Sequence, residues 1–468
     1  MTQPQTTARL EQFAAKMAAE GLGELVIETF AHYYRKLVAG ETGLIRDADI
    51  LPLAPAEVPR AEELADFTAA GKKAFDLAVR IVLNGGLGTS MGLVGPKSLL
   101  TVTEGRSFLE IILRQAEASG TRLALMNSFN TQAQTLAALS RLKPARPPAW
   151  FLQHKFPKVL REGFAPAVWP ANPELEWNPP GHGDVYPALH ASGLLEKLLA
   201  EGVRYAFICN SDNLGARIDP ALLGYFAENR LPFMMEVAEK TPADIKGGHL
   251  ARLRAGDRLV LREAAQCPAN ETAAFQDIRR YRYFNTNNIW VNLEFLRELI
   301  ARRRIIELAM IVNPKTLDPR DAQSPPVYQI ETAMGAGISL FEGAAAVNVP
   351  RSRFLPVKKC SDLLAVRSDC FLASEREGLT LNPARAAAGL GDSVKVSLDP
   401  RHYGKFDQLE ERFPQGPPSL VACEAFTVKG DVRFEGGVVV RGSVTVTNTA
   451  DTQAVVKGGT LIERDLVL

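Results

Sequence analysis

The sequence predicts an α/β protein, with a central sheet covered by helices and a small parallel β-helix after it. Two observations support this fold class. From about residue 78, short apolar runs that end in small or polar residues alternate with helical stretches, as in α/β sheets. Near the C-terminus, three consecutive six-residue units share one period, which is typical of a parallel β-helix.

The N-terminal part is predicted to be helical. Apolar residues occur at helical spacing over residues 8–40, and Gly21 and Gly23 interrupt them. This pattern indicates two amphipathic helices with a break between them. A Pro-rich connector, Leu51 to Pro59, follows. We therefore expect an N-terminal helical region over residues 1–76.

The central part is predicted to contain buried parallel strands. The strongest candidates are Ala78 to Leu83, Leu123 to Met126, Tyr205 to Cys209 and Phe233 to Val237. In open α/β sheets, ligands bind in the crevice outside the carboxyl ends of the strands. The residues that follow these four runs are therefore the first candidates for function, within a catalytic domain expected over residues 77–375.

The C-terminal part, residues 376–468, carries the hexads Lys429–Phe434, Glu435–Val440 and Arg441–Val446. Each hexad would form one short strand and a turn. Three hexads are too few to fold alone, so they should dock on the α/β domain or on a second copy of it. An irregular antiparallel sheet is the alternative. The residues that share the period of six are Gly430, Gly436 and Gly442, and Phe426, Val432, Val438 and Val444.

The composition excludes several classes of protein. The chain of 468 residues has 54 Lys and Arg against 53 Asp and Glu, so the net charge of +1 argues against a general nucleic-acid or membrane-surface binder. No stretch of about 18 apolar residues predicts a membrane span, and no leader pattern precedes the first helix. The five cysteines form no C-x-x-C pair for zinc or redox chemistry, which favours a reducing cytoplasm. They are Cys209, Cys267, Cys360, Cys370 and Cys423.

A Gly-rich segment, Leu83 to Ser98, follows the first strand and is the strongest local motif. Glycines let backbone N–H groups approach phosphates closely. Pro96 separates Gly95 from Lys97, so this is not a Walker A loop, and the glycine spacing is not that of the dinucleotide fingerprint. The motif therefore predicts a nucleotide-binding loop of another class, with Lys97 as a cation beside the phosphates; a flexible surface loop is the alternative.

Four further motifs carry polar groups. Asp212 lies at the end of the third strand, three residues after Cys209, and suits Mg²⁺, which needs only one or two protein carboxylates besides substrate phosphates. His182 lies in a Pro-Gly turn and could donate to a phosphate or a sugar. The amides of Phe284–Asn288 suit hydroxyl groups, and Val349–Lys359 brings four cations into nine residues, which favours a cationic wall.

Together these motifs resemble the UTP:glucose-1-phosphate uridylyltransferase (UDP-glucose pyrophosphorylase) family of the eukaryotic type. The similarity runs from Leu83 through Asp362 and is weaker over the N-terminal helices and the C-terminal hexads. The segments that carry it are Asn84–Gly92, Gly95–Ser98, Met126–Thr131, Pro179–Tyr186, Ser211–Ala216, Lys246–Gly248, Phe284–Asn288, Ile311–Asp318 and Asn348–Lys358.

The resemblance implies a GT-A (Rossmann-like) nucleotidyltransferase domain, N-terminal helices and a C-terminal left-handed parallel β-helix. It implies Mg²⁺ as cofactor, held by Asp212, and Lys358 and Lys97 as catalytic cations. It also assigns binding roles. The implied nucleotide-binding residues are Leu83, Asn84, Gly85, Gly86, Lys97, Gln153, Gly181, Asp212 and Lys358, with Gln153 and Gly181 at the uracil, and the implied sugar-phosphate-binding residues are His182, Asn210, Glu236 and Asn287.

The implied substrates are UTP and glucose 1-phosphate. The sugar phosphate would attack the α-phosphorus of UTP and needs no general base, because its oxygen is already ionised. Two other readings are a UDP-sugar or UDP-N-acetylhexosamine pyrophosphorylase of broader specificity and a catalytically silent nucleotide-sugar sensor. Assembly of copies through the C-terminal domain is left open. Small departures from the family pattern leave an altered sugar preference open: Lys155 and Lys158 where Arg is frequent, Cys209 before Asn210, and Glu239 where Asp is common.

Overall fold

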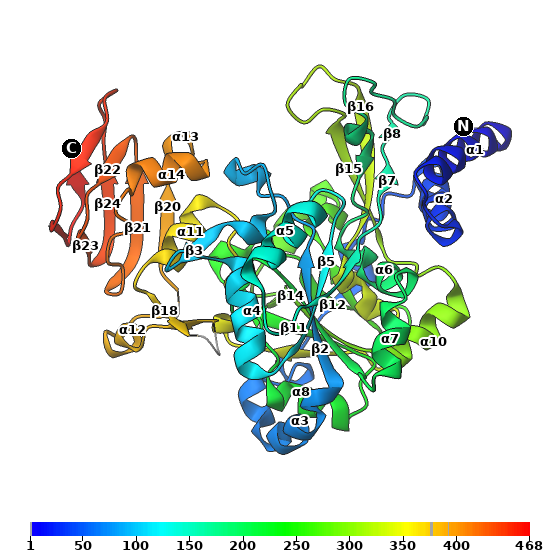
Figure 1. Cartoon of the computed structure of the whole chain (residues 1–468), viewed down its shortest axis with the longest axis horizontal. Helices are drawn as coiled ribbons and strands as arrows, with labels where there is room; N and C mark the ends of the chain where they lie inside the picture. The colour runs from blue at the N-terminus through cyan, green and yellow to red at the C-terminus, as the bar shows by residue number, and fades with distance from the viewer. Residues whose placement is uncertain (1, 375–377, 392) are drawn as a thin grey trace.

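The structure, a computed structural model, describes residues 2–374, 378–391 and 393–468. The N-terminal helices and the C-terminal strands lie at opposite ends of the longest axis, with the large sheet between them (Figure 1). The predicted boundary between residues 375 and 376 falls outside the described residues. Within them, no helix is both long enough and apolar enough to span a bilayer.

The central sheet has ten strands, and seven of them follow the order β1-β12-β14-β10-β2-β5-β6. β14 also pairs with β11, which pairs with β17, and β13 pairs with β12. The four predicted strands are confirmed as β2, β5, β10 and β11. The strands are β1 (Ile50–Pro52), β2 (Ala78–Asn84), β5 (Arg122–Asn127), β6 (Ala149–Leu152), β10 (Tyr205–Asn210), β11 (Phe233–Glu239), β12 (His249–Leu253), β13 (Leu259–Arg262), β14 (Tyr283–Asn292) and β17 (Ala345–Asn348).

β2 lies in the middle of the sheet, and all seven of its residues are buried. Its side chains alternate between two hydrophobic cores, because successive residues of a strand point to opposite faces. Val79, Ile81 and Leu83 join the core on one face, and Ala78 and Val82 join the core on the other. The carboxyl end of β2 is therefore held from both sides.

Helices cover both faces of the sheet. The face that carries Val79 packs against α6 (Val185–Ala191), α7 (Leu194–Ala200) and α10 (Leu293–Arg303). The other face packs against α3 (Thr68–Ala74), α4 (Phe108–Ser119), α8 (Pro220–Glu228) and α11 (Cys360–Arg367). β10, β2, β5 and β6 run parallel, so their carboxyl ends meet at one edge.

The two predicted N-terminal helices are present as α1 (Gln3–Ala19) and α2 (Glu24–Val38). Gly21 between them has a φ of 73°, a left-handed conformation that favours glycine. Phe13, Phe30 and Tyr34 pack these helices against two small sheets. One sheet has the order β15 (Met310–Thr316), β16 (Pro326–Thr332), β8 (Val159–Leu160), and the other pairs β7 (Phe156–Pro157) with β9 (Trp177–Asn178).

The expected connector from Leu51 to Pro59 is partly a strand. β1 pairs with β12 and forms an edge of the large sheet. Proline lacks an N–H donor and is tolerated in edge strands, which is why a Pro-rich segment reads as a connector and still pairs here.

The C-terminal region is built from parallel ladders. Phe426 pairs with Val444, three hexads further along the chain, so one coil contains three hexads. Phe426, Val432, Val438 and Val444 are all buried, as their common period predicts. The ladders are β20 (Lys395–Leu398), β21 (Cys423–Lys429), β24 (Gly442–Thr447) and β27 (Leu466–Val467); β22 (Val432–Phe434) and β25 (Ala454–Val456); and β23 (Val439–Val440) and β26 (Leu461–Ile462).

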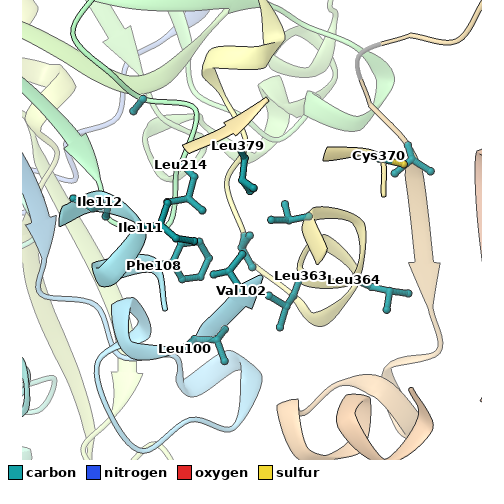
Figure 2. Close-up of a cluster of buried hydrophobic side chains, with 14 of the residues drawn as sticks. Leu100, Val102, Phe108, Ile111, Ile112, Leu214, Leu363, Leu364, Cys370 and Leu379 are labelled. Atoms are coloured by element: carbon teal, nitrogen blue, oxygen red, sulfur yellow. The ribbon is translucent and has the colours of Figure 1, made fainter. Parts of the chain in front are cut away.

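The C-terminal region docks on the α/β part of its own chain. One continuous hydrophobic core contains Phe108 and Ile111 of α4, Leu363 and Leu364 of α11, and apolar residues of the coils. Figure 2 shows this junction, with Cys370 beyond α11. Short elements around the junction are β3 (Thr101–Thr103), β4 (Arg106–Ser107), β18 (Phe371–Ser374), β19 (Gly378–Leu381), α12 (Pro383–Ala387), α13 (Pro400–Tyr403) and α14 (Phe406–Arg412).

Candidate active site

A cleft of about 410 Å³ lies at the carboxyl ends of β2 and β10. Most of the residues predicted from the sequence line it, although they come from widely separated segments. Those in the lining are Leu83, Gly85, Gly86, Lys97, Gln153, Gly181, His182, Asn210, Asp212, Asn287 and Lys358. Four further lining residues, Leu87, Met126, Pro179 and Ser211, belong to the motifs that carry the resemblance but had no predicted binding role.

The Gly-rich segment forms a closed loop beside β2. Leu87 and Pro96 pair across it, and the N–H of Lys97 donates to the carbonyl of Gly86 at 3.1 Å. A Cβ on Gly85 would lie 2.8 Å from Oε1 of Gln153, so glycine permits the approach of that amide. Because these contacts join the two ends of the loop, Lys97 lies at the cleft beside Gly86.

Asp212 joins the two predicted catalytic cations. Its Oδ2 accepts hydrogen bonds from Nζ of Lys97 at 2.6 Å and from Nζ of Lys358 at 3.0 Å. Burial pushes the pKa of Asp212 upward, but the neighbouring ammonium groups of Lys358 and Lys97 outweigh it and hold the pKa below its usual value. Asp212 is therefore ionised. Its Oδ1 is buried and has no hydrogen-bond partner among the described residues.

The two lysines differ in exposure. The side chain of Lys97 is 13% exposed, whereas that of Lys358 is 56% exposed. The backbone of Lys358 is nevertheless fixed, because Oδ2 of Asp362 accepts from the N–H of Lys358 at 2.7 Å and from that of Lys359 at 2.8 Å. Asp362 thereby positions the segment that carries Lys358, a role for which the sequence gives no local signal.

The expected cationic wall over Val349–Lys359 does not form. Arg351 pairs with Asp244, and Arg353 pairs with the buried carboxylate of Glu236. Of the four cations in this segment, only Lys358 lines the cleft. A buried carboxylate needs a countercharge, and this requirement takes Arg353 into the core.

Glu236 and Asn84 lie outside the cleft lining. The two oxygens of Glu236 accept from Arg353, from Nε1 of Trp290 at 3.0 Å and from Nδ2 of Asn288 at 2.9 Å. Asn84 donates from Nδ2 to Oδ1 of Asn127 at 2.7 Å and supports the loop from below. The roles predicted for these two residues at the substrate stay predictions.

Asn287 reaches the cleft through an irregularity in β14. Between Glu236 and Val237 of β11, the register shifts so that residues 286 and 287 have no partner. Asn287 has a φ of 58°, a left-handed conformation that Asn adopts more readily than most residues. Asn285 holds it through two reciprocal hydrogen bonds. The bulge turns the side chain of Asn287 towards the cleft.

His182 presents one defined nitrogen to the cleft. Its Nδ1 accepts from the backbone N–H of Met334 at 3.0 Å, so the ring proton resides on Nε2. Burial and the ammonium group of Lys358 lower the pKa of His182 to about 4. The ring is therefore neutral near pH 7, and Nε2–H is available as a donor.

Gln153 is held in one orientation. Its Nε2 donates to the carbonyl of Gly181 at 2.7 Å, which leaves Oε1 as the free acceptor. Gly181 has a φ of 78°, and a Cβ there would lie 2.3 Å from the carbonyl oxygen of Thr332. Glycine at this position is thus required by both backbone conformation and space.

The cleft fits a cation that is held mainly by its substrate. Over the described ranges, no three His, Cys, Asp or Glu residues gather as a metal centre. Asp212 contributes the carboxylate of the lining, and its Oδ1 is buried and unpartnered. Mg²⁺ commonly uses one or two carboxylates together with substrate phosphates, so this donor set matches it.

Comparison with known proteins gives consistent matches. The family model for UTP–glucose-1-phosphate uridylyltransferase matches residues 27–441. The enzyme of that name from Solanum tuberosum is 39% identical over 407 residues, which are 85% of this chain and 83% of the relative. The one from Saccharomyces cerevisiae is 40% identical over 393 residues, which are 82% and 77% of the two chains.

Solved structures match over nearly the whole chain. A point mutant of UDP-glucose pyrophosphorylase from Leishmania major, in complex with UDP-glucose, has a TM-score of 0.90 and 38% identity, with 98% of this chain and 99% of the other covered. The UDP-glucose phosphorylase from Trypanosoma brucei has a TM-score of 0.89 and 40% identity, with 98% and 100% covered.

Proposed function

The chain belongs to the UTP–glucose-1-phosphate uridylyltransferase family, and from this premise we propose that it converts UTP and glucose 1-phosphate into UDP-glucose and pyrophosphate. It is a nucleotidyltransferase. The observation that carries the proposal is the meeting of Lys97, Asp212 and Lys358 in the cleft at the strand ends.

In the proposed reaction, a phosphate oxygen of glucose 1-phosphate attacks the α-phosphorus of UTP. The new bond joins that oxygen to the α-phosphorus, and the bond from the α-phosphorus to the oxygen that bridges to the β-phosphate breaks. Pyrophosphate leaves with the electron pair. The attacking oxygen is ionised at neutral pH, so the chain has no proton to remove.

The main obstacle is repulsion between the phosphates. Two like charges about 4 Å apart repel by about 4 kcal/mol at an effective dielectric near 20, and several such pairs meet here. Lys97 and Lys358 flank the cleft and lie close enough together to share Asp212. We assign them to neutralising the phosphates, aligning them and stabilising the leaving pyrophosphate.

The proposed cofactor is Mg²⁺, with Asp212 as its protein ligand. Oδ1 of Asp212 has no partner among the residues that the structure describes, which supports this assignment. When bound, Mg²⁺ would supply further positive charge to the triphosphate.

The substrates are proposed to lie with the base against Gln153 and Gly181 and the sugar phosphate towards His182, Asn210 and Asn287. Oε1 of Gln153 is an acceptor, which suits the N3–H of uracil and opposes the N3 lone pair of cytosine. Nε2–H of His182 suits a phosphate oxygen. We keep Glu236 as a proposed sugar ligand, which requires an exchange of one of its partners.

We also propose the finer fold class. The parallel sheet edge that carries the cleft supports a GT-A-like nucleotidyltransferase domain, and the stacked hexads support a left-handed parallel β-helix. The last coil leaves unpaired strand edges and exposes Leu461 and Val467, which supports an assembly of copies through this end.

Pyrophosphate release from UTP and glucose 1-phosphate, with and without Mg²⁺, tests this function. We expect release only when both substrates and Mg²⁺ are present. Asp212→Asn should reduce release by about a hundredfold or more, because it removes a charge from the metal ligand. The control Asp369→Asn changes a carboxylate that binds backbone N–H groups in the C-terminal region, and it should stay near wild type. The absence of pyrophosphate from the wild type would refute the function.

A further inference from the structure

The base-reading part of the cleft is made from two separate segments of chain. Gln153 follows β6, and Gly181 lies in the turn before α6. Their one direct link is the hydrogen bond from Nε2 of Gln153 to the carbonyl of Gly181, at 2.7 Å. The orientation of the amide, and with it the acceptor that faces the base, depends on the spacing of these two segments.

Asp184 ties the same two segments together. Its Oδ2 accepts from the backbone N–H of His154 at 2.7 Å, and its Oδ1 bonds to Nδ1 of the His154 ring at 2.8 Å. Its own N–H donates to the carbonyl of Gly181 at 3.3 Å. Asp184 thus contacts the residue after Gln153 with its side chain and contacts Gly181 with its backbone.

The pair of Asp184 and His154 is largely buried, and its carboxylate is charged. The side chain of Asp184 is 5% exposed and that of His154 is 15% exposed. Burial lowers the pKa of His154, but the carboxylate of Asp184 outweighs it and raises the pKa overall. An ionised carboxylate can only accept, so the Nδ1 nitrogen of His154 carries a proton and donates to Asp184 in a charge-assisted hydrogen bond.

We propose that Asp184 and His154 are positioning residues that set the base specificity of the enzyme by fixing the distance between Gln153 and Gly181. Neither side chain is in the cleft lining, so neither is proposed to touch the substrate. At the correct distance, Nε2 of Gln153 is bound to Gly181 and Oε1 faces the N3–H of uracil. If the segments separate, the amide can rotate and present N–H, which suits the N3 lone pair of cytosine. This inference rests on the proposed function.

The test compares UTP with CTP in steady-state kinetics, through the ratio of their kcat/KM values. Asp184→Ala removes both side-chain bonds, and we expect the preference for UTP to fall at least tenfold, with KM for UTP raised more than kcat is lowered. A purely structural role would lower activity with both nucleotides equally and leave the ratio unchanged.

A pair of variants at the partner residue separates geometry from loss of folding. His154→Ala removes the ring donor, whereas His154→Asn places an N–H at nearly the position of Nδ1. We expect the first to lose preference for UTP and the second to keep it. If Asp184→Ala does not fold, this pair decides the question. Asp369 is a carboxylate that also accepts from backbone N–H groups and one side chain, and it is not in the cleft lining, so Asp369→Ala should keep the wild-type ratio.

Calorimetric binding of UMP and CMP to the same variants gives a readout that does not need turnover. Wild-type protein that prefers UMP but makes no UDP-glucose would refute the proposed function and leave the positioning role open to the same comparison of variants. A UTP to CTP ratio within twofold of wild type in Asp184→Ala and His154→Ala would overturn the inference. An equal loss of the preference for UTP over CTP in His154→Asn and His154→Ala would overturn the inference as well.

Discussion

Asp212 shows how a single buried carboxylate organises the cleft. Removing a charge from water is costly unless it is paired, and two ammonium groups offset that cost here. One of its oxygens serves both lysines, and the other is left without a partner in the part of the chain that the structure describes. The residue thus keeps two cations close together before any phosphate arrives.

Lys358 is expected to act in the transfer step itself. Lys358→Ala should lower kcat by about 10² to 10³, with a smaller effect on KM, because a preorganised cation stabilises charge that develops during the reaction. Lys358→Arg should be little more active than Lys358→Ala, since the planar guanidinium group of Arg replaces the compact ammonium group of Lys poorly. Steady-state kinetics with UTP and glucose 1-phosphate measure both effects.

Lys359→Ala is the matched control. Lys359 is the next residue and an exposed cation, but it is not in the cleft lining. It should keep a kcat close to wild type. A Lys358→Ala enzyme with unchanged kcat and a raised KM for UTP would show that Lys358 binds only the ground state.

His182 is expected to make stability depend on pH. Its pKa is about 4 in the folded protein and 6.5 as a free side chain. Between these values the unfolded chain binds a proton that the folded chain does not, so the free energy of unfolding falls as pH drops from 6.5 to 4. The slope is at most about 1.4 kcal/mol per pH unit, and no loss occurs above pH 6.5.

Urea titrations at pH 7, 6, 5 and 4 measure this dependence. His182→Gln has no titrating ring, so its stability should fall less steeply than that of wild type over the acid range. Parallel curves for the two proteins would contradict the lowered pKa.

At the scale of elements, the bulge in β14 determines which side chain of that strand faces the cleft. In a regular β14, alternation would determine which face each residue of Phe284–Asn288 occupies. The register shift opposite Glu236 and Val237 interrupts this alternation. Asn287 lines the cleft, whereas Asn288 is buried and donates to Glu236.

Asn287 should matter to both stability and substrate binding. Asn287→Ala places an ordinary side chain at positive φ, which costs about 1 kcal/mol relative to Asn287→Gly. Both variants lose the amide, so both should raise KM for glucose 1-phosphate. Denaturation midpoints and steady-state kinetics separate the two effects.

Lys143 is the control residue for the effect of a positive φ without any contact with the cleft. It also has a positive φ, but it ends α5 (Gln132–Leu142) and does not line the cleft. Lys143→Gly should therefore leave KM unchanged. An unchanged KM in Asn287→Gly would show that the amide does not bind the sugar phosphate.

At the scale of the whole molecule, the α/β part and the C-terminal coils share one hydrophobic core. That core runs from α4 through α11 into the stacked strands. Phe434 lies within the coils and stacks on Phe413, with ring centroids 4.9 Å apart. The two parts are therefore expected to unfold together.

Phe434→Ala tests this cooperativity. Truncation of a buried Phe typically costs 3–5 kcal/mol, and we expect about that loss here. The four tryptophans, Trp150, Trp169, Trp177 and Trp290, all precede the C-terminal region. A cooperative molecule would show the full shift in tryptophan fluorescence as well as in circular dichroism. Two separate transitions, with fluorescence unshifted, would show independent units.

The sequence alone determined the features that depend on local pattern. Periodicity identified the two N-terminal helices, four strands and the hexads, because burial of one face repeats at the spacing of each element. Motifs with glycines and charged residues identified most of the cleft lining, since close approach to an anion restricts which residue types can stand there. The resemblance to a family supplied the substrates.

Only the tertiary structure decided which groups are free to act. Sequence could not show that Arg353 is taken into the core by Glu236, or that Asn84 supports the loop from beneath. The pairing of Asp184 with His154 joins residues thirty positions apart and carries no local signal. The physical reason is that charge pairing and hydrogen bonding depend on distances across the fold, whereas periodicity and turn chemistry depend only on neighbours along the chain.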